Sequence, residues 1–288
     1  KKCLKQRPAH ALMNQVGNFY GFSSMPFSPF APVVEKDSAG AFLEAEPYQL
    51  LREGKVLDVP WITSFTADEG LLPTGLLWQK LEEADEKWVE IAPYLLDCND
   101  TVPVAKRETV AKEVLDYYLG PEEKINKKNF KQFTRIFTDR LFAVSAELSA
   151  KLQAKAAKSP VYFYIFNYTE GENKLEHYFS KTPEIEGVGH GEDAFYFYGA
   201  APAKPLSEQD KRLATACHNM LYSYASGGNP SFDGTNSWQP TESDEIIYLA
   251  VNGPEDFKLE RSENLTPIDF WNKLGLLEHE NLLVKDEL

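Results

Sequence analysis

Cysteine is scarce in this 288-residue sequence, which contains only Cys3, Cys98 and Cys217. No two of them stand in a Cys-x-x-Cys spacing and the five histidines are scattered, so we expect no structural metal site. The odd count would leave one thiol of a secreted chain without a partner inside that chain. Cys217 falls on an apolar helical stripe, which predicts a small buried hydrophobic residue.

Basic residues and long apolar runs are also lacking. Lys and Arg number 30 against 44 Asp and Glu, which gives a formal net charge of −14. Such a surface repels phosphate backbones and anionic lipids, so we expect neither nucleic acid nor a polybasic membrane contact. No stretch approaches the ~18 consecutive apolar residues of a membrane span. The chain opens on Lys1 without the apolar segment of a signal peptide, and we expect the gene product to start upstream.

What the sequence does contain is apolar and aromatic material arranged as alternating strands and helices. Hydrophobic residues make up 43% and aromatic residues 13% of the chain, enough for a large core. The patterns predict helices within 41–52, 71–158, 208–225 and 267–274, and strands over 56–65, 160–168, 246–251 and 257–259. Pro60 is expected to delay the regular pairing of the first strand. This order predicts an α/β fold with a largely parallel sheet.

Two polar turns follow predicted strands, where open α/β sheets carry their chemistry. Glu69 lies in the turn 66–70, and His190 lies in the glycine-rich turn 187–191. A histidine on such a turn suits proton transfer when a carboxylate fixes its tautomer. Taken singly, each residue is more often an ordinary loop residue, and Asp68 competes with Glu69 for the role of the acid. The acid precedes the histidine by about 120 residues, the chain order of α/β-hydrolases.

Several motifs, in order and spacing, closely resemble the type-B carboxylesterase family over residues 2–271. They are Phe30-Ala31-Pro32-Val33-Val34, Glu46-Pro47-Tyr48-Gln49-Leu50-Leu51, Val59-Pro60-Trp61 before Asp68-Glu69-Gly70, Pro160-Val161-Tyr162-Phe163-Tyr164, Gly187-Val188-Gly189-His190-Gly191-Glu192-Asp193, Ser226-Gly227-Gly228-Asn229-Pro230 and Trp238-Gln239-Pro240. The segment Trp61-Ile62-Thr63-Ser64 resembles insect members, including juvenile-hormone-esterase-like and venom-esterase-like proteins.

This resemblance implies that residues 1–274 are the C-terminal half of an α/β-hydrolase domain, with the N-terminal strands of the sheet missing. It implies Glu69 as the triad acid and His190 as the general base of a serine esterase that uses no cofactor. Cys3 resembles one partner of a family disulfide whose other cysteine lies in the missing region.

The resemblance also bears on the substrate. Leu71 and Leu72 stand where cholinesterases carry aromatic residues that hold a quaternary ammonium group. Leucine there implies a small apolar ester instead. Phe27 and Phe30 resemble residues of an acyl pocket, although core packing is an equally good interpretation of two phenylalanines in a proline-rich loop.

The nucleophile elbow Gly-x-Ser-x-Gly of the family is absent, as is its glycine-rich oxyanion segment. The nearest run, Gly21-Phe22-Ser23-Ser24-Met25, lacks the second glycine and a preceding strand. Both elements belong upstream of Lys1, so we interpret the chain as truncated, partnered by a missing N-terminal half and inactive alone. Such a cut would also leave one strand with an unpaired edge.

The last residues, 275–288, form an acidic tail that ends in Lys285-Asp286-Glu287-Leu288, the address read by the KDEL receptor. It predicts retention in the lumen of the endoplasmic reticulum. Glycosylation sequons begin at Asn99, Asn167 and Asn264. Asn99 and Asn264 are the candidates for use, because Asn167 falls in the predicted strand 160–168.

Two other functions stay open. A non-catalytic, esterase-like binding or adhesion protein is one, since the family includes members that have lost the triad. An unrelated α/β binding domain is the other, and it would separate Glu69 from His190 in space.

Overall fold

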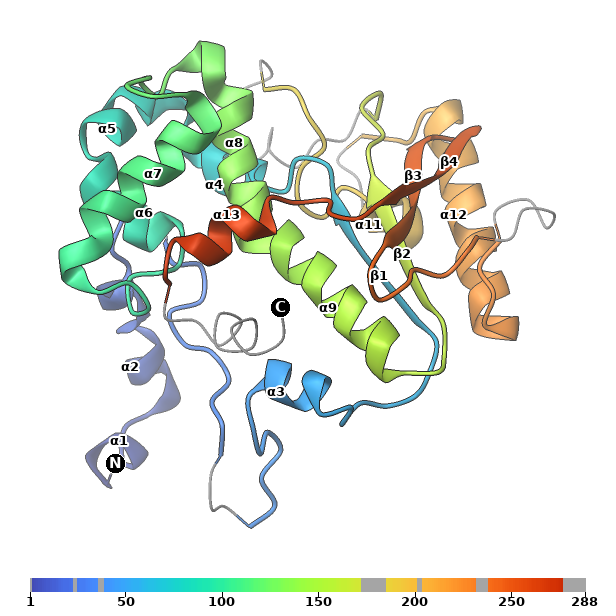
Figure 1. Ribbon diagram of the computed structural model, residues 1–288, viewed down its shortest axis with the longest axis horizontal. Coiled ribbons are helices and arrows are strands. Elements are labelled where there is room, and N and C mark those ends of the chain that lie inside the picture. The colour runs from blue at the N-terminus through green and yellow to red at the C-terminus, as the bar shows by residue number, and fades with distance from the viewer. Residues whose placement is uncertain are drawn as a thin grey trace.

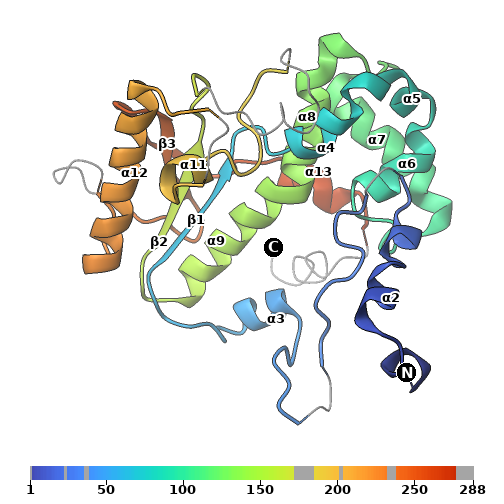
Figure 2. The same cartoon turned by 180° about the vertical axis from the view of Figure 1, so that it is seen from behind.

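The computed structural model describes residues 2–22, 25–35, 39–171, 185–200, 204–231 and 238–276. A sheet with flanking helices lies beside a group of short helices, and the N-terminal residues extend away from both (Figures 1 and 2). The helices are α1 (Lys2–Lys5), α2 (Ala9–Met13), α3 (Pro47–Arg52), α4 (Leu71–Leu77), α5 (Leu81–Glu86), α6 (Trp88–Leu95), α7 (Arg107–Leu119), α8 (Phe130–Thr138), α9 (Val144–Ala156), α11 (Ala194–Phe197), α12 (Glu208–Gly227) and α13 (Ile268–Lys273).

The sheet contains β1 (Trp61–Thr66), β2 (Val161–Phe166), β3 (Ile246–Gly253) and β4 (Asp256–Ser262), paired in that order. β1, β2 and β3 run parallel to one another, and β4 is antiparallel to β3. In register, Trp61 lies opposite Val161 and Thr66 lies opposite Phe166. The expected α/β class with a mostly parallel sheet is therefore confirmed.

β2 is buried on both faces, which explains its nearly unbroken aromatic and β-branched sequence. Tyr162, Tyr164 and Phe166 pack with α12, where Cys217 is fully buried as expected. Phe163 faces the other way and packs with Phe65 of β1 and with α9. Helices thus cover both faces of the sheet.

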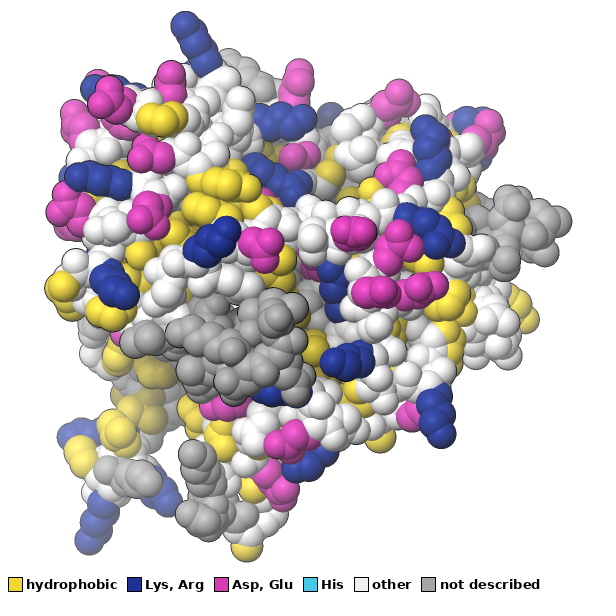
Figure 3. Space-filling view, in the orientation of Figure 1, with side chains coloured by type: hydrophobic (Ala, Val, Ile, Leu, Met, Phe, Trp, Pro, Cys, Tyr) yellow, Lys and Arg dark blue, Asp and Glu magenta, His cyan; other side chains and the backbone are white. Residues whose placement is uncertain are grey.

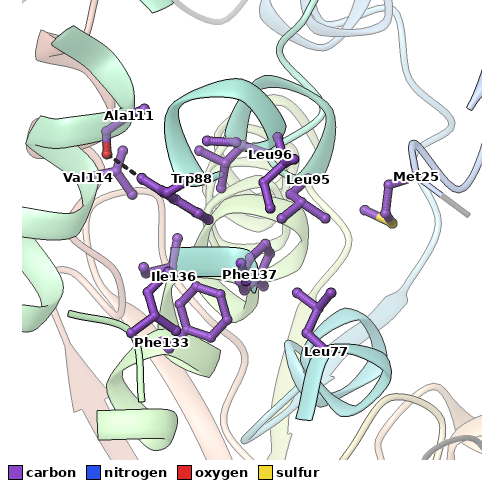
Figure 4. Close-up of a cluster of buried hydrophobic side chains, with 14 of the residues drawn as sticks. Met25, Leu77, Trp88, Leu95, Leu96, Ala111, Val114, Phe133, Ile136 and Phe137 are labelled. Atoms are coloured by element: carbon purple, nitrogen blue, oxygen red, sulfur yellow. Dashed lines mark hydrogen bonds between the residues drawn. The ribbon is translucent and has the colours of Figure 1, made fainter. Parts of the chain in front are cut away.

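The group of short helices has its own apolar core, centred on Trp88 (Figure 4). The Trp88 ring lies against Phe133 and Phe137 of α8, with ring centroids 5.7 and 6.5 Å apart. Its indole N–H donates a 2.7 Å hydrogen bond to the carbonyl oxygen of Ala111 in α7. This bond satisfies the polar atom that burial of a tryptophan would otherwise leave unpaired.

The boundaries of three elements differ from the ranges given above. Within 56–65 the first strand begins only at Trp61, as expected from Pro60, which cannot donate a ladder hydrogen bond. The helix predicted over 41–52 is only α3, since Pro47 at its start disfavours helical backbone in the residue before it. β4 extends over Asp256–Ser262, well beyond 257–259, because its exposed polar residues gave no apolar signal.

β1 forms one edge of the sheet and, among the described strands, pairs only with β2. Large apolar side chains are also exposed in the N-terminal residues, including Val33, Phe42 and Leu57, of which Phe42 is 96% exposed. Figure 3 shows hydrophobic side chains on the surface around α1 and α2. An open strand edge and exposed apolar side chains both favour association with other polypeptide.

We expect the 288-residue chain expressed alone to associate or to pack loosely. Light scattering after gel filtration should show a mass that rises with protein concentration. Replacing Phe42 and Leu57 by Gln should reduce association, whereas Tyr222→Gln, at an aromatic residue of α12 that is also largely exposed, should not. A monomer that melts in a sharp two-state transition would contradict this expectation.

Candidate active site

Glu69 lies in a turn that begins where β1 ends. Its side chain is buried, and its Oε1 accepts a 2.7 Å hydrogen bond from the backbone N–H of Thr66. The next residue, Gly70, lies so close to α8 that a Cβ would stand 2.1 Å from the carbonyl oxygen of Thr134. The N–H of Gly70 donates to the Thr138 hydroxyl, 2.9 Å away. The turn is therefore fixed on both sides, and the orientation of the Glu69 carboxylate is fixed with it.

His190 lies in the glycine-rich segment that leads into α11. Its Nδ1 is 2.6 Å from Oε2 of Glu69, a short contact between residues 121 positions apart. The imidazole is 48% exposed, whereas the Glu69 side chain is 6% exposed. A proton on Nδ1 donates to the carboxylate and leaves Nε2 as the acceptor. The pair therefore presents a basic nitrogen whose tautomer is set by a buried carboxylate.

Asp68, the other acidic residue of the turn, makes a different contact. Its Oδ2 accepts a 3.0 Å hydrogen bond from the backbone N–H of Val188. Geometry thus places Glu69, and not Asp68, against the imidazole.

The charges around His190 alter its protonation. The hydrogen bond to Glu69 raises the pKa of His190 above its ordinary value, and partial burial acts against this increase. The negative charges of Glu69 and Asp193 raise the pKa further. The imidazole consequently stays protonated to a higher pH than a free histidine does.

A cavity of about 350 Å³ opens beside the pair. Its lining combines the acidic and basic groups with apolar side chains: Ser64, Phe65, Glu69, Leu141, Phe142, Ala146, His190, Gly191 and Asp193. The ring centroid of Phe142 is 5.0 Å from that of His190. One wall of the cavity is therefore apolar and directly next to the imidazole.

Leu141 and Phe142 come from a π-helical segment, Asp139–Ala143, between α8 and α9. Single π-turns inside helices are frequent at functional sites because they redirect side chains. This one is anchored by the buried Asp139, which forms a salt bridge with the Arg135 guanidinium at 2.7 Å and accepts a hydrogen bond from the Tyr118 hydroxyl at 2.8 Å. Sequence analysis missed both lining residues, since a π-turn has no recognised sequence signature among helix-forming residues.

Asp193 is a second carboxylate of the cavity that sequence analysis did not single out. The Tyr164 hydroxyl of β2 donates to its Oδ2 at 2.7 Å, and burial raises the pKa of Asp193. Asp193 stands three residues after His190 in the motif 187–193, and this position was the one feature of the sequence that could have indicated it as a site residue.

Other predicted site residues lie away from this cavity. Leu71 is buried in the core of the short helices and Leu72 is partly exposed at the start of α4. Phe27 and Phe30 lie among the N-terminal residues, where the Phe30 ring packs on Phe19 with centroids 4.8 Å apart. None of the four lines the cavity described above. Their assignment as substrate-binding residues stays a prediction.

The remaining candidates are scattered. Cys3 is an exposed thiol in α1. Asn99 is partly buried and Asn264 is exposed, while Asn167 lies exposed just beyond the end of β2 and not within a strand. The segment Lys285–Leu288 lies outside the described residues. The disulfide, glycosylation and retention assignments stay predictions.

Two general features are absent from the described part of the chain. None of its helices is long and apolar enough to cross a membrane. Its His, Cys, Asp and Glu side chains nowhere gather in a group of three or more that could hold a metal ion.

We expect Glu69→Gln to lower the pKa of His190, because the neutral amide removes both the charged hydrogen-bond partner and its negative charge. Titration of the His190 imidazole by NMR measures this shift. Asp193→Asn should lower the pKa less, since Asp193 acts on His190 only through its charge.

The same shift links the pair to stability. Because the pKa of His190 is raised in the folded state, its protonated form contributes stability that is full below the ordinary pKa of histidine. That contribution is lost as the pH rises through the folded-state pKa.

An NMR titration in which Glu69→Gln leaves the pKa of His190 unchanged would contradict Glu69 as the cause of the raised pKa.

Comparisons with known proteins agree with the sequence resemblance. Residues 1–271 match the model of the carboxylesterase family. The chain is 32% identical to venom carboxylesterase-6 of Apis mellifera over 289 residues, covering 96% of this chain and 50% of that protein. It is 31% identical to a carboxylic ester hydrolase of Bombus ignitus, over 96% of this chain and 50% of that protein. It is 29% identical to esterase-5B of Drosophila miranda, over 90% of this chain and 50% of that protein.

A solved structure shares the fold. The crystal structure of juvenile hormone esterase from Manduca sexta, with OTFP covalently attached, superposes with a TM-score of 0.70 at 20% sequence identity. The match covers 95% of this chain and 52% of the esterase. The chain thus spans about half the length of the curated relatives that it matches. On the family match over residues 1–271, this chain belongs to the carboxylesterase family.

Proposed function

We propose that Glu69 and His190 are the acid and the general base of a Ser-Glu-His triad in an enzyme that hydrolyses apolar carboxyl esters. The observation that supports this most strongly is the 2.6 Å contact between Nδ1 of His190 and the buried Glu69 carboxylate. It lies at a cavity with an apolar wall, in a member of the carboxylesterase family.

In this mechanism Nε2 of His190 takes the proton of a serine hydroxyl as the serine oxygen attacks the ester carbonyl. The buried Glu69 stabilises the imidazolium that forms, without taking its proton. The imidazolium then protonates the leaving alcohol. Water activated by the same nitrogen hydrolyses the acyl-enzyme, and both products leave without any cofactor.

The serine must come from elsewhere, since no Gly-x-Ser-x-Gly motif occurs in residues 1–288. The relatives are about twice as long as this chain, which supports an upstream half that carries the nucleophile and the oxyanion hole. On this proposal the 288 residues alone do not turn over an ester, because they contain the base without its nucleophile.

The lining of the cavity supports an apolar ester. Phe65, Leu141, Phe142 and Ala146 offer hydrocarbon surface next to His190. We assign to Phe142 the contact with the apolar group that flanks the scissile bond, because its ring stands 5.0 Å from the imidazole. Leu71, Leu72, Phe27 and Phe30 are proposed to contribute further apolar surface in the longer protein.

The secretory pathway is the proposed location. One relative is named a venom carboxylesterase, which supports passage through that pathway. The ending Lys285-Asp286-Glu287-Leu288 has the form of a retention address for the endoplasmic reticulum. On this proposal the acidic tail, residues 275–288, holds the esterase in the lumen through the KDEL receptor.

The sequence of the transcript upstream of Lys1, followed by kinetics of the complete protein, tests the proposed reaction. We expect a Gly-x-Ser-x-Gly elbow and hydrolysis of short aryl esters that a serine-directed organophosphate abolishes. His190→Ala and Glu69→Gln should each lower kcat by about 10⁴-fold. His218→Ala, an exposed histidine on α12, should leave kcat unchanged.

An upstream region without that serine would overturn the proposed reaction. The esterase-like binding protein would then be the better function, with Glu69 and His190 as remnants of a triad.

Deleting residues 285–288 tests the location. We expect the shortened protein to appear in the culture medium of secreting cells, while the unshortened protein stays inside them. Adding one residue after Leu288 should have the same effect as the deletion, because the receptor reads only a free end. Equal secretion of the shortened and unshortened proteins would contradict retention.

A further inference from the structure

The segment that carries His190 is bound to the turn that carries Glu69 by a pair of hydrogen bonds one residue before the acid. The backbone N–H of Asp68 donates to the carbonyl oxygen of Val188 at 2.9 Å. In return the N–H of Val188 donates to Oδ2 of Asp68 at 3.0 Å. These two residues are 120 positions apart in the chain, so the pair fixes the relative position of two distant segments.

Close packing surrounds this pair. Gly187 has a φ of +145°, and a Cβ there would stand 2.9 Å from Oδ2 of Asp68 and 2.7 Å from Cδ1 of Leu71. Val188 is itself fully buried, in the core that also contains Tyr164 and Phe166 of β2. Only glycine fits at 187, because the backbone passes directly against the acid turn with a φ that other residues rarely adopt.

The two hydrogen bonds between Asp68 and Val188 lie close to both residues of the site: Asp68 is one position before Glu69, and Val188 is two positions before His190. On one side Glu69 follows Asp68 directly, and its carboxylate is already held by the N–H of Thr66. On the other side only Gly189 separates Val188 from His190, and Gly191 follows the histidine. A half-exposed imidazole flanked by two glycines has little local restriction of its own. The distance between Nδ1 and Oε2 therefore depends on the hydrogen bonds that hold this segment, at Val188 before the histidine and at Asp193 after it.

We propose that Asp68 is a positioning residue, whose carboxylate and backbone N–H clamp the His190 segment at Val188 and so bring the imidazole to Glu69. The structural part of this proposal stands on geometry alone, and its effect on rate rests on the proposed esterase function. The carboxylate of Asp68 binds the backbone at Val188, whereas the carboxylate of Glu69 binds the imidazole of His190, so the two adjacent acids have different partners.

The test uses the complete protein with its upstream half. Asp68→Ala removes the acceptor for the Val188 N–H, while Asp68→Asn keeps an oxygen acceptor and removes the charge. Asp58→Ala is a matched control, since Oδ1 of Asp58 accepts from the N–H groups of Lys158 and Ser159 at 2.9 and 2.7 Å, near the other end of the sheet. Three readouts are recorded: the NMR titration of His190, amide exchange of Val188, and kcat against pH.

We expect Asp68→Ala to lower the pKa of His190 and to speed exchange of the Val188 amide, because the imidazole loses its fixed contact with Glu69. It should lower kcat by roughly ten- to a hundred-fold with little change in KM. Asp68→Asn should retain most of the wild-type behaviour, and Asp58→Ala should leave the His190 titration unchanged.

Several results would overturn the clamp. An unchanged His190 titration in Asp68→Ala, or an equal shift in Asp58→Ala, would do so. Asp68→Asn behaving like Asp68→Ala would show that charge and not the hydrogen bond matters. If Asp68→Ala fails to fold, fast exchange of the Val188 amide in the unaltered protein would overturn the clamp and slow exchange would support it. A protein without esterase activity refutes only the proposed function, because the titration and the amide exchange still report on the clamp.

Discussion

The hydrogen bond between Nδ1 of His190 and the Glu69 carboxylate is the interaction around which the described fold is arranged. Because β1 and β2 pair in parallel, their carboxyl ends lie side by side at one end of the sheet. Glu69 lies just beyond the carboxyl end of β1. Val188, further along the chain, lies at the same end of the sheet, where it forms hydrogen bonds with Asp68. The short contact of 2.6 Å follows from the pairing of the strands and from the anchoring of the His190 segment by hydrogen bonds.

The helices on one side of the sheet pack against the turn that carries Glu69 and form the apolar wall of the cavity. The close approach of Gly70 to α8 covers Glu69, and the π-turn after α8 presents Phe142 to His190. Buried carboxylates keep this layer in place. Asp139 holds the π-turn, and Glu147 of α9 accepts from the N–H and the hydroxyl of Thr266 at 3.0 and 2.7 Å. Such groups are costly to bury, and the ion pair of Asp139 and the hydrogen bonds of both carboxylates offset that cost.

Much of this arrangement could be predicted from sequence. The aromatic and β-branched run predicted β2, the apolar stripe predicted α12, and the alternation of strands with helices predicted a largely parallel sheet. The delay of β1 by Pro60 was predicted, whereas two other boundaries were not. Pro47 shortens the helix expected over 41–52, and the exposed polar residues of the edge strand β4 gave no apolar pattern. The contact of Glu69 with His190 joins residues far apart in the chain, so the order of the family motifs predicted it and no local pattern did. Phe142 reaches the cavity only through an extra residue in one helical turn, and neither it nor the clamp of Asp68 on Val188 was predicted.

The most direct test of the central claim is a crystal structure of the complete protein after reaction with an organophosphate. We predict a phosphorylated serine from the upstream half, with its Oγ within about 3.2 Å of Nε2 of His190 and its apolar substituent against Phe142. Phosphorylation of a residue elsewhere, or an unlabelled protein in which the pair of Glu69 and His190 is intact, would contradict the assignment of these residues as a catalytic acid and base.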